Sequence, residues 1–178
     1  MPQKIRKLKP ADLKDAALHY LGRYAASTLR LRQVMTRRIR RSAKANDLDP
    51  QPLLEELERV IAMLIRTGLL NDTAFAEART RSLNRRGGSR RQIAGKLAMA
   101  GVARDTAAQA LSQLEDELPD AEYGAALAYA KRRRLGAFRN PVDSTPERRR
   151  KDLMAMARAG FALDLARRAL TGAEPEMQ

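Results

Sequence analysis

The chain has 178 residues, a formal net charge of +14 and a pI near 11.0, and this excess of positive charge predicts attraction to nucleic acid, an anionic membrane or an acidic protein face. The absence of cysteine excludes disulfides, thiolate metal sites and cysteine nucleophiles, and is typical of a cytoplasmic protein. No apolar run approaches the roughly 18 residues needed to span a bilayer, so we expect no membrane partner.

The first third of the chain is predicted to be helical after a short arm. Residues 1–11 are basic and lack the apolar core of a signal peptide, so we expect a mobile basic arm. Helical periodicity then predicts helices over 13–24, 27–41 and 52–67, with Ser27 as an N-cap. No Gly ends the second of these helices. We expect Ile39 or a near neighbour to take that place, in a longer and differently capped connection.

The middle of the chain repeats this order with clearer boundaries. Asn71 is a candidate N-cap for a helix through Leu83, and a loop of two Arg and two Gly follows. A second helix through Ala100 starts with Ser89 and Gln92 at capping-box spacing, and Gly101 ends it where a left-handed C-cap is required. A third helix starts at Ala103. Its predicted buried side comprises Ala107, Ala110, Leu111 and Leu114.

The last third resembles the middle third. The 21 residues from Arg150 match those from Arg91 without a gap at nine positions, including a Gly, an Asp, a Leu and an Arg. Gly160 corresponds to Gly101, Ser144 and Glu147 have capping-box spacing, and Pro146 fits a first helical turn. The strongest breaks in the chain lie at 85–88 and 138–143. The loop between the first two helices is longer here by about eleven residues.

This duplication predicts an array and not one irregular domain. We expect an all-α fold of three tandem three-helix repeat units that form an elongated, curved array. The units span 12–68, 69–117 and 118–172, and a short tail follows at 173–178. Arrays bind long partners along a surface, so the expected function is binding and not catalysis.

Three clusters of basic residues are the candidate binding site. The first cluster flanks Gly87 and Gly88 before a helix start, where free N–H groups and the helix dipole favour an anion. The other two surround the corresponding loop of the third unit, so stacked units predict one stripe that follows a phosphate backbone or an acidic groove. The alternative is that these are solvated faces that offset helix dipoles. The clusters are Arg85, Arg86, Arg90 and Arg91; Lys131, Arg132, Arg133 and Arg134; and Arg148, Arg149, Arg150 and Lys151.

Other residues predict structure more than chemistry. His19 is interpreted as an ordinary helix residue, and Asp105 and Asp164 as first-turn residues that stabilise the helix dipole. The acidic group near Glu56 spreads around a helix, so we expect no catalytic or metal site and no cofactor. Phe75, Tyr123 and Phe161 are predicted core anchors, since few aromatic residues are available for base stacking.

Two segments resemble a known family. Gly68 to Val102 is similar to the central motif of the RecX family of recombination regulators, and Tyr20 to Met35 is similar to its N-terminal motif. The central motif combines Leu70-x-Asp72, Phe75-Ala76, the basic Gly-rich loop, and Ile93, Leu97 and Gly101 in register. With the third unit, the resemblance covers 12–170. It implies an all-α protein that binds the RecA recombinase, lies along the groove of its filament on DNA and restrains it.

The chain departs from the family pattern at four positions. Asn71 replaces an acidic residue, Arg30 stands where a Glu is usual, and the usual Arg near Tyr24 and near Leu83 are missing. An acid-to-base exchange at Arg30 reverses the charge presented to any partner there.

The function predicted is a non-enzymatic, monomeric regulator of the RecA filament that also binds single- or double-stranded DNA without sequence preference. The alternative is a direct DNA-binding protein of the helix-turn-helix type, because short helix-Gly-helix units with Arg at helix starts can read a duplex. A nuclease would require converging carboxylates, and the sequence shows none. The two functions predict different observations. A filament regulator should act substoichiometrically on RecA, whereas a helix-turn-helix protein should strongly prefer one operator sequence.

Overall fold

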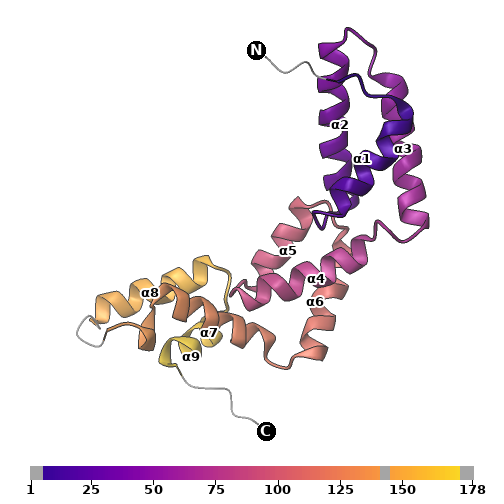
Figure 1. Cartoon of the computed structure of the whole chain (residues 1–178). Helices are drawn as coiled ribbons and strands as arrows, with labels where there is room; N and C mark the ends of the chain where they lie inside the picture. Colours follow the sequence, from indigo (N-terminus) through magenta and orange to yellow (C-terminus); the bar gives the residue numbers. More distant parts are fainter. Residues whose placement is uncertain (1–5, 141–144, 173–178) are drawn as a thin grey trace. The chain divides into compact units, whose positions relative to one another are not determined.

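The computed structural model describes residues 6–140 and 145–172. Within these ranges the chain consists of α-helices and one short 3-10 turn, with no strand (Figure 1). The predicted all-α fold class is therefore confirmed. The chain divides into two compact units, Met1–Phe75 with Ala100–Val102 and Ala76–Met99 with Ala103–Gln178. The predicted tail at 173–178 and part of the predicted break, 141–143, lie outside the described residues.

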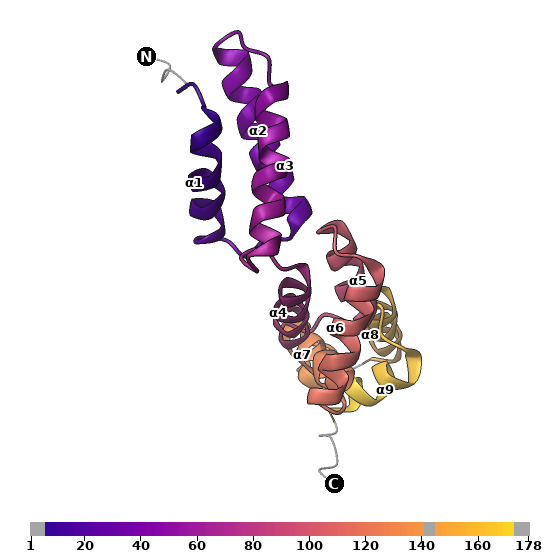
Figure 2. The ribbon, with the colours of Figure 1, turned by 90° about the vertical axis from the view of Figure 1, so that its right-hand side faces the viewer.

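Three helices form the body of the first unit. α1 (Pro10–Leu21), α2 (Thr28–Ala45) and α3 (Gln51–Arg66) lie side by side in both views (Figures 1 and 2). Each is apolar along one side, and these sides share a buried core because that removes them from water. The largest buried side chains of this core are Leu13, Leu31, Met35, Ile39, Leu57, Ile61 and Leu64.

The connection between α2 and α3 differs from the expectation in one respect. α2 continues past Ile39 to Ala45, and Ile39 is fully buried, so the prediction that it ends the helix is wrong. The left-handed residue is instead Asp47, with φ 50°. The Leu48 N–H donates to the Ala43 carbonyl at 3.0 Å and closes the turn. Helix α2 is longer than predicted because its apolar periodicity continues for another turn.

The structure also corrects the prediction of a mobile arm over 1–11. Residues 1–5 lie outside the described part, but Leu8 is buried in the first core and its N–H donates to Ser42 Oγ at 3.0 Å. The Lys9 N–H donates to Asp12 Oδ2 at 2.9 Å, and Pro10 begins α1. Burial of one Leu is enough to fix this segment against α2.

The second unit contains most of the remaining helices. α4 (Asp72–Arg85) starts in the first unit and continues into the second. It is followed by α5 (Arg90–Met99), α6 (Arg104–Glu117), α7 (Ala121–Arg133), the 3-10 turn η1 (Gly136–Phe138), α8 (Pro146–Arg158) and α9 (Leu163–Thr171). Tyr123, Met156 and Phe161 are the largest side chains of the core formed by α7, α8 and α9. The predicted buried side of α6 is confirmed. None of the described helices combines the length and apolarity needed to cross a bilayer.

Most predicted helix ends are confirmed. Gly101 and Gly160 have φ of 78° and 92°, in the left-handed region where Gly avoids the penalty of a side chain. Ser27, Asn71 and Ser89 each accept a hydrogen bond from the N–H three residues later, as N-caps do. The predicted cap Ser144 lies outside the described residues, and the N-cap of α8 is the next residue along the chain. Thr145 caps α8, since its Oγ1 accepts from the Arg148 N–H at 3.3 Å.

Candidate polyanion-binding surface

All three basic clusters lie in the second unit, and every one of their side chains is exposed. The first cluster surrounds the α4–α5 loop, the second ends α7, and the third begins α8. Apart from Arg90 and Arg149, these side chains form no ion pair with a carboxylate in the described ranges. Their charge is therefore available to an anionic partner.

The fold brings the first two clusters together. Gly87, with φ 77°, packs so closely on α7 that a Cβ there would lie 2.7 Å from the Tyr129 backbone nitrogen. The Arg132 guanidinium donates to the Arg86 carbonyl across this junction. A side chain at residue 87 would force the loop off α7, so this glycine positions the first cluster beside the second.

Aromatic contacts hold part of the second cluster. The guanidinium carbons of Arg132 and Arg133 lie 5.6 and 5.8 Å from the centroid of the Tyr129 ring. Cation–π attraction at this distance orders both side chains while leaving their N–H groups exposed. Arg134 adopts φ 52° at the C-cap of α7 and turns the chain toward η1.

The third cluster lies farther from the first cluster than the second cluster does. The far end of α8 meets the first cluster, where Arg91 donates to the Arg158 carbonyl at 3.4 Å. Arg148 and Lys151 are about 10 to 15 Å from Arg158 at 1.5 Å per helical residue. No hydrogen bond or ion pair among residues 6–140 and 145–172 joins Arg148, Arg150 or Lys151 to the other clusters. The continuous stripe stays a prediction.

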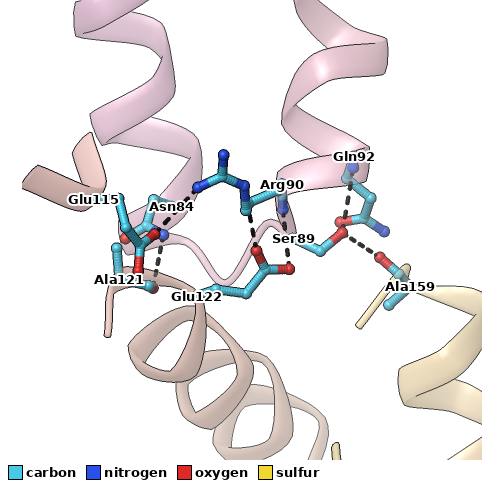
Figure 3. A network of polar contacts seen from close by, with 8 residues as sticks. All are labelled: Asn84, Ser89, Arg90, Gln92, Glu115, Ala121, Glu122 and Ala159. Atoms are coloured by element: carbon cyan, nitrogen blue, oxygen red, sulfur yellow. Dashed lines mark hydrogen bonds and ion pairs between the residues drawn. The ribbon is translucent and has the colours of Figure 1, made fainter. Parts of the chain in front are cut away.

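The prediction of free amide groups at the start of α5 is wrong for two of its first three residues, Arg90 and Gln92. The Arg90 N–H donates to Glu122 Oε1 at 3.3 Å, and the Gln92 N–H donates to Ser89 Oγ at 3.2 Å (Figure 3). Gly87, Gly88 and Ser89 are buried. The anion that this helix start attracts is thus a carboxylate of the chain itself, and an external phosphate would have to displace it.

Arg90 belongs to the same internal network. Its side chain lies 3.2 Å from Glu115 and 3.9 Å from Glu122 (Figure 3). Burial raises the pKa of Glu122, and the hydrogen bond from the Arg90 backbone, together with the charge of Arg90, opposes that rise. Asn84 completes the network by donating to the Ala121 carbonyl at 2.9 Å. Arg90 is therefore a weaker candidate for partner binding than Arg85 or Arg86.

The start of α2 is built in the same way. Ser27 Oγ accepts from the Arg30 N–H and donates to the Ala100 carbonyl, and the Thr28 N–H donates to Asp72 Oδ1 at 2.7 Å. In α5 the equivalent groups are Ser89, Ala159 and Glu122. Sequence reasoning missed the role of Asp72 and Glu122 in capping. The signal for it is an acidic residue in the first turn of α4 and α7.

The four departures from the family pattern fall at different kinds of position. Asn71 Oδ1 accepts from the Ala74 N–H at 3.0 Å, a role an acidic residue there would share. Leu83 is buried. Tyr24 is 54% exposed and packs on Tyr20, and Arg30 is exposed on α2. Asn71 is also exposed, so all of these positions except Leu83 present a changed surface to a partner.

The remaining candidates are structural. His19 is exposed in the last turn of α1. Asp105 and Asp164 occupy the first turns of α6 and α9, as predicted. The predicted core anchors Tyr123 and Phe161 are buried, and Phe75 is half-buried.

These observations define a class: an all-helical protein of repeated helical units with exposed basic clusters. The model of the RecX second three-helix domain matches residues 71–111. The regulatory protein RecX of Myxococcus xanthus is 40% identical over 169 residues, which cover 95% of this chain and 89% of the relative. The regulatory protein RecX of Agrobacterium fabrum is 32% identical over 165 residues, which cover 92% of this chain and 85% of that relative. The chain belongs to the RecX family.

Solved structures agree on the fold. A crystal structure of RecX from Lactobacillus salivarius is similar with a TM-score of 0.66, at 19% identity, and the match covers 92% of this chain and 95% of that one. A second crystal structure, of a regulatory protein RecX, is similar with a TM-score of 0.60 at 18% identity. The match covers 89% of this chain and 70% of that one. At this identity the likeness concerns the tandem helical fold alone.

Proposed function

We propose that this RecX-family regulatory protein binds the RecA recombinase filament on DNA and inhibits its assembly and activity in recombination and repair, as a cytoplasmic monomer without catalytic activity. Membership of the family carries the proposal. The exposed clusters of the second unit support it, since their cations suit both the phosphates of DNA and an acidic groove.

The three-unit organisation, 12–68, 69–117 and 118–172, is part of the proposal. Its support is the repeated cap, in which a Ser at the start of one helix donates to the carbonyl that precedes a left-handed Gly in a later turn. A repeated junction of this kind is what an array requires between neighbouring units.

The helix-turn-helix alternative receives less support. A recognition helix presents its N-terminal residues to base edges. At the start of α5, however, Arg90 is paired with Glu115 and Glu122, and the first amide is already bonded. A sequence-specific reader would have to break this network.

The decisive experiment is a titration of this protein into RecA bound to single-stranded DNA while ATP hydrolysis is followed. We expect the rate of ATP hydrolysis to fall even when far less than one regulator is present per recombinase. A regulator that blocks filament growth acts on many subunits. A rate unchanged at equimolar protein would contradict the proposal. A DNA site bound on the order of a thousandfold more tightly than scrambled DNA at equal salt would favour the alternative.

A further inference from the structure

One strongly charged surface lies outside the three clusters. Helix α2 (Thr28–Ala45) carries seven basic residues and no acidic residue in 18 positions. It belongs to the first unit, whereas all three clusters belong to the second. The basic residues are Arg30, Arg32, Arg37, Arg38, Arg40, Arg41 and Lys44.

Five of these residues share one side of the helix. At 3.6 residues per turn they fall within an arc of about 100°, and they extend about 21 Å along the axis. The opposite side is buried in the core through Leu31, Met35 and Ile39. All five are exposed, and a groove beside them is lined by Arg32, Gln33, Thr36, Arg37 and Arg40. We call this set, Arg30, Arg37, Arg40, Arg41 and Lys44, the α2 basic face.

Carboxylates of the described residues do not balance the charge of the α2 basic face. Arg32, which lies outside the face, donates to both oxygens of Glu58 at 2.7 and 2.9 Å. The five residues of the face form no ion pair with any carboxylate in the described ranges. Arg37 and Arg41, and likewise Arg40 and Lys44, are four residues apart, where like charges repel. Such an arrangement weakens the isolated helix, so a bound anion would stabilise it.

The composition of the face favours phosphates over a protein partner. Protein interfaces are also enriched in Arg, but their core is rich in aromatic residues and Met and poor in charged residues. None of the large exposed hydrophobic side chains among the described residues belongs to α2. The face also contains no aromatic side chain on which bases could stack. A row of Arg and Lys suits the regularly spaced charges of a nucleic-acid backbone.

We propose that the α2 basic face is a second binding surface, in the first unit, for the sugar-phosphate backbone of DNA. It rests on the proposed function for its setting at a filament on DNA, and it adds a contact with DNA in the first unit, separate from any contact made by the three clusters of the second unit. Because the contact is to phosphates, it is independent of base sequence and sensitive to salt.

The test compares two triple variants with the same loss of charge. Arg37→Gln, Arg40→Gln and Lys44→Gln change the face. The matched control changes exposed cations elsewhere in the first unit that form no ion pair with the described carboxylates, as Lys14→Gln, Arg23→Gln and Arg66→Gln. Fluorescence anisotropy with labelled DNA, over a range of salt and for two unrelated sequences, gives the affinity and its salt dependence. Circular dichroism and thermal unfolding establish that both variants are folded.

We expect the face variant to bind DNA about 10- to 100-fold more weakly, with a log–log salt slope shallower by about 2 to 3, for both sequences. The control should change the slope by less than about one. Equal losses in the two variants would overturn the inference, because they would reflect net charge alone. Unchanged DNA binding with loss of RecA binding would also overturn it, in favour of an acidic protein partner.

Two further variants keep the test decisive. If the triple variant does not fold, Arg37→Gln and Lys14→Gln give the same comparison, with an expected slope change of about one for the first alone. The double variant Arg37→Lys and Arg40→Lys keeps both charges and should keep the parent's slope. A parent without effect on RecA that still binds DNA through α2 would refute the proposed function and leave this inference standing.

Discussion

The hydroxyl of Ser89 donates to the carbonyl of Ala159 at 2.6 Å, across 70 residues of sequence. The hydroxyl of Ser27 donates in the same way to the carbonyl of Ala100, across 73 residues. In each case the carbonyl precedes a Gly with positive φ, and the Ser also caps its own helix. One buried hydroxyl therefore serves a local helix start and a distant turn, and it does so twice in the chain.

Ser27→Ala and Ser89→Ala should each lower the free energy of unfolding by about 1 to 2 kcal/mol, because the cap is lost and the carbonyl of half-buried Ala100 or of buried Ala159 loses its donor. Urea denaturation measures the change. Ser112→Ala is the matched control, since Ser112 is exposed within α6, and it should have almost no effect. Equal stability of all three variants would show that the shared hydroxyl stabilises nothing.

Glycine substitutions should have opposite signs at two kinds of position. Gly160→Val and Gly101→Val should each cost about 1 kcal/mol or more, because φ is positive and, at Gly160, a Cβ would lie 2.7 Å from Ser89 Oγ. Gly95→Ala should instead stabilise by about 0.5 to 1 kcal/mol, since this helical Gly has open space around its Cβ position. Thermal midpoints that did not separate the two groups would contradict the assignment of caps.

Comparison of sequence and structure shows which interactions are local. The Gly and Ser signals predicted helix ends at residues 27, 89, 101 and 160 because capping is decided within a few residues. The capping roles of Asp72 and Glu122 were not predictable in this way. Each acts on a helix start that precedes it by more than thirty residues, and the identity of that start depends on packing.

The candidate site shows the same limit. Exposure of the basic clusters followed from composition, but the internal pairing of Arg90 did not, because Glu115 and Glu122 approach it only in the fold. Burial of Leu8 is a third example, since one apolar residue in a basic segment carries no periodicity.

The pKa of Glu122 predicts a pH dependence. Burial raises the pKa of this carboxyl above its ordinary value of 4.5, so the folded protein takes up a proton at higher pH than the unfolded chain. The stability of the parent relative to Glu122→Gln should therefore increase as pH falls through the raised pKa, and level off below 4.5. Urea denaturation of the parent and of the variant over this pH range measures the difference in their free energies of unfolding.

Glu58→Gln should change the pH dependence of stability in the opposite direction. The hydrogen bond from Arg32 lowers the pKa of Glu58, so its contribution is present above 4.5 and is lost as pH falls through the lowered pKa. The pair is exposed, so the difference at neutral pH should be only about 0.5 kcal/mol. Parallel pH profiles for the two variants would contradict both assignments.

The first basic cluster should divide into binding and scaffold residues. Arg85→Gln with Arg86→Gln removes two exposed charges that form no ion pair among residues 6–140 and 145–172, so the free energy of unfolding should change by less than about 0.5 kcal/mol. Binding to DNA and to the RecA filament should weaken, because each lost charge-assisted contact typically removes on the order of 1 kcal/mol. Arg90→Gln should do the reverse: it removes the ion pairs with Glu115 and with the half-buried Glu122, so stability should fall more than affinity. Denaturation and binding measured on the same preparations separate the two effects, and a double variant that binds like the parent would remove Arg85 and Arg86 from the site.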